Sequence, residues 1–215
     1  MNNQAQPRSA KARSFWQRFP EKEELNQYWY SPSTVERMAD EVLEQTTAGA
    51  RCAFLSTPSV YFDAKAKTSG GLRELFLFDR HQWIEQGLIL GQYDSKFSTE
   101  KEQFIQYDFN RPDAIPPSLQ HSMDFVVVDP PFITKEVWEL YDRAIRLLLR
   151  PTTGKIVLST IVENESLIHA LLGCQMQRFK PSIPHLVYQY ALYANYKSSL
   201  LSELNPEVDP EGEHD

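Results

Sequence analysis

Hydrophobic residues follow two different periods along the chain, and each period predicts a different element. Where apolar residues recur every three or four positions they mark one face of a helix, as Val35, Met38 and Val42 do. Short unbroken apolar runs between turn-forming residues instead indicate buried strands. Helices are predicted at residues 33–45, 135–149 and 163–172. Strands are predicted at residues 52–55, 88–93, 103–107, 124–128, 155–160, 175–179 and 187–196.

The order of these elements predicts the fold class. Strands that alternate with helices are typical of α/β proteins, in which helices cover both faces of a mostly parallel sheet. The last two strands follow the final helix with only a loop between them, so we expect an antiparallel hairpin at one edge of the sheet. The sequence therefore predicts a Rossmann-like, seven-stranded α/β fold.

Polar residues close several of the predicted strands. Asp94, Asp108 and Asp129 each follow one strand, and the first strand ends in the Ser-Thr-Pro-Ser turn of residues 56–59. In open α/β sheets, ligands bind outside the carboxyl ends of the strands. We therefore expect these residues to converge on one cleft.

The two ends of the chain differ in composition from its middle. Residues 1–22 are rich in Gln, Asn, Ser and basic residues, which predicts a flexible arm, although Phe15, Trp16 and Phe19 could dock on the body. Residues 203–215 contain six acids and no Lys or Arg, a composition typical of a disordered acidic tail. We assign the folded domain to residues 23–202.

Composition and charge narrow the possible classes of function. The net charge of -7 and the pI of about 5.3 argue against a dedicated nucleic-acid binder, because such proteins neutralise phosphates with Lys and Arg. No apolar run approaches the roughly 18 residues of a membrane helix. The N-terminus does not resemble a secretory signal, although its basic, acid-free stretch leaves a transit peptide open. Cys52 and Cys174 have no CxxC partners, and no Cys/His cluster has metal-ligand spacing. We expect a cytoplasmic monomer with reduced thiols, no metal, no membrane contact and no stable nucleic-acid partner.

The segment Asp129-Pro130-Pro131-Phe132 carries the candidate chemistry. The Asp129 carboxylate and the Pro130 carbonyl can each accept a hydrogen bond from an amino group, and would thereby aim its lone pair at a sulfonium methyl. The prolines stiffen the turn and add no competing donor, while Phe132 offers a flat wall to a base or to a lysine side chain. An ordinary strand-ending turn is the alternative. The segment favours methyl transfer to an amine with S-adenosylmethionine as the donor.

The cofactor site must differ from a dinucleotide site, because the chain contains no GxGxxG motif. The turn that contains Ser56 and Pro58 could bring backbone groups close to the methionine part of S-adenosylmethionine. Asp94 could accept hydrogen bonds from the ribose hydroxyls, and Asp108 could bind the adenine amino group. Asp79, which follows a second apolar run, is a rival candidate for the ribose.

Several segments resemble the eukaryotic lysine methyltransferases of translation elongation factor 1-alpha, a group first labelled as N6-adenine-specific DNA methyltransferases. The matching segments are residues 27–31 (Gln-Tyr-Trp-Tyr-Ser), 56–61, 92–97, 104–110 and 124–132, and they follow the order of the family. The resemblance implies a class I methyltransferase domain over residues 23–202, with S-adenosylmethionine as cofactor and elongation factor 1-alpha as protein substrate.

The resemblance also implies roles for individual residues. Those near the N-terminus would help to close the pocket, with Tyr28 and Trp29 toward the substrate and Tyr30 toward the cofactor. The segment 129–132 would hold the target amine, with Phe132 also contacting the substrate. The remaining cofactor contacts would come from Ser56, Pro58, Asp94, Asp108 and Asp129.

Three departures from the family pattern stand out. Phe132 replaces a common Tyr, and the N-terminal arm is basic where an acidic extension would be expected. Residues 68–87 look like an insertion, so the spacing to Phe104 favours Asp94 over Asp79 for the ribose. The leading hypothesis is a lysine methyltransferase of elongation factor 1-alpha. Methylation of adenine N6 in DNA or RNA is the alternative, and a non-catalytic binding module that kept the fold is a third possibility.

Overall fold

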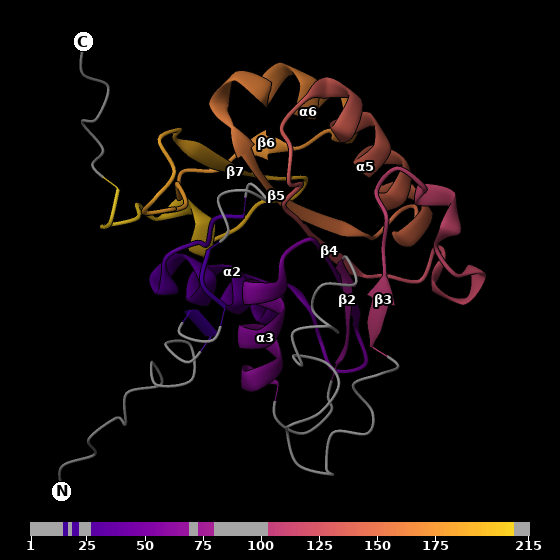
Figure 1. Cartoon of the computed structure of the whole chain (residues 1–215). Coiled ribbons are helices and arrows are strands. Elements are labelled where there is room, and N and C mark those ends of the chain that lie inside the picture. Colours follow the sequence, from indigo (N-terminus) through magenta and orange to yellow (C-terminus); the bar gives the residue numbers. More distant parts are fainter. Residues whose placement is uncertain (1–14, 17–18, 22–26, 69–72, 80–102, 209–215) are drawn as a thin grey trace, which may run out of the picture.

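The computed structural model of the 215-residue chain describes residues 15–16, 19–21, 27–68, 73–79 and 103–208 (Figure 1). Its centre is a seven-stranded sheet with the order β3-β2-β1-β4-β5-β7-β6. The strands are β1 (Arg51–Leu55), β2 (Glu74–Asp79), β3 (Phe104–Gln106), β4 (Phe125–Val128), β5 (Lys155–Ile161), β6 (Gln175–Met176) and β7 (Tyr190–Ala194). The helices are α2 (Pro32–Gln45), α3 (Pro58–Lys67), α5 (Lys135–Leu148) and α6 (Glu165–Leu172).

The direction of the strands confirms the predicted fold class. Strands β3, β2, β1, β4 and β5 run parallel, whereas β7 is antiparallel to β5 and β6 is antiparallel to β7. The edge pair after α6 is therefore the expected antiparallel hairpin. It is shorter than the sequence predicted, because only two residues of β6 pair with β7.

The second strand of the sheet corrects one prediction. Glu74–Asp79 forms β2 and pairs in register with β1, from Arg51 opposite Glu74 to Leu55 opposite Phe78. The insertion expected at residues 68–87 therefore contains a central strand, whose apolar residues are buried on both faces as a parallel sheet requires. The strand predicted at residues 88–93, and Asp94 after it, lie outside the described residues.

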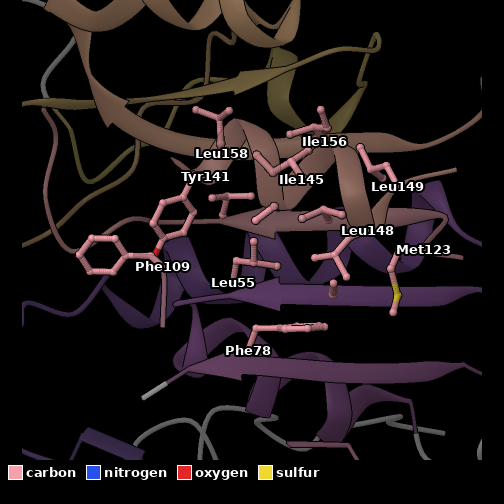
Figure 2. Close-up of a cluster of buried hydrophobic side chains, with 14 of the residues drawn as sticks. Leu55, Phe78, Phe109, Met123, Tyr141, Ile145, Leu148, Leu149, Ile156 and Leu158 are labelled. Carbon is pink, nitrogen blue, oxygen red and sulfur yellow. The ribbon is translucent and has the colours of Figure 1, made fainter. Parts of the chain in front are cut away.

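Helices cover both faces of the sheet, and the alternation of side chains along the strands divides the core accordingly (Figure 1). On one face, Leu55, Val128 and Leu158 pack with α5 and α6. Figure 2 shows Leu55 and Leu158 close to Ile145 of α5. On the other face, Phe54 and Val127 pack with α2 and α3. This division determines which residues of each strand can reach each side of the cavity described below.

Local sequence signals explain how α2 and α6 begin and end. The Ser31 hydroxyl caps α2 by accepting a hydrogen bond from the Thr34 amide at 3.1 Å, and Pro32 occupies the first turn. Gly173, with a φ of 65°, adopts the left-handed conformation that ends α6.

Segments near both ends of the chain pack against the domain. Phe15 and Phe19 form a buried cluster with Trp29, whose indole donates to the Phe19 carbonyl at 2.8 Å. Beyond residue 202, Asn205 is buried and its amide donates to the Lys180 carbonyl at 2.8 Å. The packed body thus reaches Val208, six residues past the predicted domain boundary. None of the helices in the described part of the chain combines the length and the apolar character of a membrane span.

Candidate active site

A cavity opens at the carboxyl ends of β1, β2 and β4, where the sequence predicted a cleft. It holds about 1110 Å³ of space, part of which is open to solvent. The residues of its wall come from the segment before α2, the β1–α3 turn, the strand ends, α5 and the loop before β7. The predicted site residues that line it are Tyr28, Trp29, Tyr30, Ser56, Pro58, Asp129, Pro130, Pro131 and Phe132.

One predicted carboxylate, that of Asp108, does not line the cavity. Asp108 is exposed, and its carboxylate accepts from the Asn110 backbone amide at 3.0 Å and from the Asn110 side chain at 2.9 Å. Its neighbours Tyr107 and Phe109 line the cavity instead. Asp94 lies outside the described residues. Asp79, at the end of β2, lines the cavity and takes the place in the sheet that Asp94 was expected to have.

The register of the sheet places Asp129 at the centre of the site. Val128 is opposite Leu158 in the parallel pair of β4 and β5, so the next residues, Asp129 and Ser159, are neighbours. The Asp129 amide donates to the Leu55 carbonyl at 3.1 Å, which fixes the backbone against β1. The Ser159 hydroxyl donates to Asp129 Oδ1 at 2.8 Å, and the Tyr30 hydroxyl lies 2.5 Å from Ser159 Oγ.

The surroundings of Asp129 change its acidity. Burial raises the pKa of its carboxyl group to about 6, while the Ser159 hydroxyl, which donates to the charged form, and the Tyr30 hydroxyl beside it act in the opposite direction. The group is therefore ionised at neutral pH and becomes protonated in mildly acidic solution. A carboxylate in this state can accept a hydrogen bond from an amine.

Aromatic rings form the wall of the cavity near Pro131 and Phe132. Phe109 stacks on Tyr141 with ring centroids 6.0 Å apart, and it meets Phe132 edge to face at 6.3 Å. Figure 2 shows Phe109 and Tyr141 side by side at one end of the buried cluster. Phe132 is 46% exposed, so its ring forms part of the mouth of the cavity.

The turn after β1 has an uncommon backbone conformation. Ser56 has a φ of 56°, in the left-handed region that residues other than glycine seldom adopt. Its amide donates to the Phe78 carbonyl at 2.9 Å, and its hydroxyl lies 2.7 Å from the Tyr141 hydroxyl. These contacts hold the β1–α3 turn against β2 and α5 at the floor of the cavity.

Two buried hydroxyls in the wall lack partners within the described part of the chain. They belong to Thr57, at the start of α3, and to Tyr107, after β3. A buried polar atom without a hydrogen bond is costly, and native structures usually satisfy such atoms with protein, water or ligand. Both hydroxyls are therefore available to a polar ligand in the cavity.

Some residues that line the cavity or contact Asp129 did not follow from the sequence pattern. Ser159 was read as part of an apolar strand, and its signal was a polar residue in the middle of Lys155–Ile161. Tyr190 was read as the interior of a strand, although it begins β7 and lines the cavity. Tyr141 lies within the helix predicted at residues 135–149, and no role in the site was predicted for it.

The fold and the site define a Rossmann-like methyltransferase, and comparison with solved structures supports the fold. A branched-chain polyamine synthase variant from Thermus thermophilus matches with a TM-score of 0.61 and 14% identity, covering 86% of this chain and 62% of that chain. A predicted O-methyltransferase from Agrobacterium tumefaciens matches with a TM-score of 0.54 and 16% identity, covering 74% of this chain and 78% of that chain.

Sequence comparison identifies the family more closely. Residues 21–198 match the family model described as Probable N6-adenine methyltransferase. EEF1A lysine methyltransferase 1 from Mus musculus is 35% identical, covering 82% of this chain and 76% of that protein. The protein of the same name from Danio rerio is 33% identical, covering 83% of this chain and 100% of that protein. The chain belongs to this family of protein-lysine methyltransferases, which confirms the resemblance drawn from the sequence.

Proposed function

We propose that the protein uses S-adenosylmethionine to methylate a lysine side chain of translation elongation factor 1-alpha. The observation that carries the proposal is the Asp129 carboxylate, held at the end of a buried strand and open to an aromatic-walled cavity. The vertebrate relatives named after this substrate support the choice of protein.

The residues of the cavity fit S-adenosylmethionine. The Asp79 carboxylate stands at the end of β2 and suits the ribose hydroxyls, so we assign it this role in place of Asp94. The unpartnered hydroxyls of Thr57 and Tyr107 could bind the polar groups of the cofactor. The turn with Ser56 and Pro58 would approach its methionine part.

Asp129 and Pro130 would orient the target amine. When bound, S-adenosylmethionine supplies a methyl group on a positively charged sulfur, and the nitrogen–carbon bond forms as the carbon–sulfur bond breaks. The Asp129 carboxylate and the Pro130 carbonyl accept hydrogen bonds from the amine and so direct its lone pair along the line of transfer. The nitrogen gains positive charge during transfer, which the ionised carboxylate stabilises.

A second candidate function is methylation of adenine N6 in nucleic acid. The description of the family model favours it, and the exposed Phe132 ring could stack on a base. The net charge of -7 weighs against it, because nucleic-acid binding depends on basic residues.

Labelled S-adenosylmethionine distinguishes these functions. The protein is incubated with purified elongation factor 1-alpha, with DNA and with RNA in separate reactions, and labelled peptides are mapped by mass spectrometry. We expect label on a lysine of the protein substrate. Label in nucleic acid alone would contradict the proposal, and Asp129→Ala, checked for folding by thermal denaturation, provides the inactive control.

We also propose that the protein acts in the cytoplasm. Cys52 and Cys174 are both free and buried in the core. Free thiols of this kind are typical of proteins that work under reducing conditions.

A further inference from the structure

The hydroxyls of Tyr30 and Ser159 form a short chain of hydrogen bonds behind Asp129. We propose that Tyr30 and Ser159 are positioning residues that hold the Asp129 carboxylate in the orientation needed to accept the target amine. This inference rests on the proposed function, because it gives Tyr30 and Ser159 a role in the proposed methyl transfer.

The direction of the hydrogen bonds follows from the number of protons available. Ser159 has a single hydroxyl hydrogen, which it donates to Asp129 Oδ1 at 2.8 Å. The Tyr30 hydroxyl, 2.5 Å from Ser159 Oγ, must then be the donor in that contact. Both hydroxyls therefore point toward the carboxylate, and Oδ1 is fixed while the group still borders the cavity.

The sheet brings the three groups together on one of its faces. Val127 and Val157 are opposite each other and face α2, so alternation places Asp129 and Ser159 on the same face two positions later. Tyr30 approaches from the segment that enters α2. Thr160 belongs to the opposite face, where the Asn164 side chain donates to its hydroxyl at 3.0 Å.

The backbone around Tyr30 is held from two directions. The Trp16 indole donates to the Tyr30 carbonyl at 3.1 Å, and the amide of the next residue, Ser31, donates to the Ser182 carbonyl at 2.8 Å. Tyr30 itself is buried. Because the Tyr30 side chain has little freedom to move, its hydroxyl can hold the Ser159 hydroxyl in one orientation.

Three tyrosines near Asp129 stay uncharged around neutral pH. The phenols of Tyr30, Tyr141 and Tyr190 face it from three elements, and burial raises the pKa of each above its usual value. Asp79 is a further carboxylate of the cavity, and no Lys, Arg or His occurs among the described residues that line it. The pKa of about 6 means that the protonation of Asp129 changes in the mildly acidic range.

Removing either hydroxyl has two expected effects on methyl transfer. Ser159→Ala should lower kcat by about tenfold to a hundredfold, the range for losing one hydrogen bond to a charged group. Tyr30→Phe removes a bond to the neutral Ser159 hydroxyl and should lower kcat by about threefold to tenfold. Each should also move the acidic limb of the pH profile to higher pH, because the hydrogen bonds favour the ionised carboxylate. Ser159→Thr restores a hydroxyl and should recover most of the activity.

Two matched variants remove comparable hydroxyls that point elsewhere. Thr160→Ala alters the neighbouring buried residue on the other face of β5, and Tyr193→Phe removes a hydroxyl that donates to the Ile161 carbonyl at 3.3 Å. Both should keep the wild-type pH profile. Thermal denaturation of every variant checks folding, and Tyr30→Phe tests the inference independently if Ser159→Ala fails to fold.

The outcomes separate the inference from the proposed function. A wild-type protein that methylates no lysine would refute the function itself. An active wild type whose Ser159→Ala and Tyr30→Phe variants keep kcat and the acidic limb would overturn only the positioning role. The inference is supported when both variants lose kcat and shift the limb while the two matched variants do not.

Discussion

Burial raises the pKa of Asp129 to about 6, and this value makes its role testable by pH. The target lysine must be neutral to accept the methyl group, and its pKa is about 10.4 in water. Below that pH the neutral fraction falls about tenfold for each unit by which the pH is lowered, and kcat/KM should fall with it. Below about pH 6, protonation of Asp129 removes the charged acceptor as well. The wild-type profile should therefore become steeper there, reaching about a hundredfold per pH unit.

Asp129→Asn separates these two ionisations. The amide keeps a carbonyl acceptor but cannot titrate, so the variant should retain a reduced activity at high pH. Its profile should keep the single slope of the lysine amine below pH 6 as well. The measurement is kcat/KM against pH for both proteins, and a wild-type profile that keeps a single slope would exclude Asp129 as the titrating group.

Asp79 and Asp108 offer a second comparison between residues. Asp79 lines the cavity, whereas Asp108 is exposed and accepts hydrogen bonds from Asn110. Asp79→Asn should weaken S-adenosylmethionine binding by about tenfold to a hundredfold, as expected for the loss of charged hydrogen bonds. Asp108→Asn should leave the affinity close to wild type. Calorimetry measures the affinity of both variants for S-adenosylmethionine. A larger loss for Asp108→Asn than for Asp79→Asn would restore the role in cofactor binding that was predicted for Asp108 from the sequence.

At the scale of elements, hydrophobic periodicity predicted the helices that have an apolar stripe and missed a helix that lacks one. The helix α5 was predicted within one residue, because Tyr141, Ala144, Ile145 and Leu148 recur on one face. Helix α3 was not predicted, since its apolar residues are adjacent and show no helical stripe. Strand β2 has a visible apolar run, but comparison of family spacing assigned it to an insertion.

The start of α2 allows a test of a local signal. Two serines, Ser31 and Ser33, lie at the start of α2, and the structure shows Ser31 as the cap. Ser31→Ala should lower the free energy of unfolding by about 1 kcal/mol, the usual cost of losing a side-chain cap. Ser33→Ala should change it by less than about 0.5 kcal/mol. Chemical denaturation of both variants measures the difference, and equal effects would contradict the assignment.

At the scale of the whole molecule, the site depends on sheet register, which local patterns do not encode. The Asp-Pro-Pro-Phe segment was visible because its chemistry and its strand are contiguous. The contact of Asp129 with Ser159 joins residues 30 positions apart in the chain, and Tyr30 is 129 positions from Ser159. Such contacts follow only once β4 and β5 are paired and α2 is packed on them.

The C-terminal boundary of the domain also depends on contacts between distant parts of the chain, and it can be tested. Composition suggested that the folded part ends at residue 202, yet the next six residues make contacts with three parts of the body. Glu203 pairs with Arg37 at 2.8 Å, the Asn205 amide donates to the Lys180 carbonyl, and Glu207 contacts Ser31. Asn205 is 3% exposed, so its removal uncovers buried polar groups as well as apolar surface.

A chain that ends at Ser202 should therefore be less stable than one that ends at Val208. The loss of the buried Asn205 contacts alone should cost about 1–3 kcal/mol of unfolding free energy, because their partners remain in place without hydrogen bonds. A chain that ends at Val208 keeps these contacts and should unfold as the full-length protein does. Urea denaturation of the three proteins compares them directly. Equal midpoints for the chains ending at Ser202 and Val208 would show that the segment adds no stability. A lower midpoint for the Ser202 chain alone would place the boundary of the folded domain beyond Asn205.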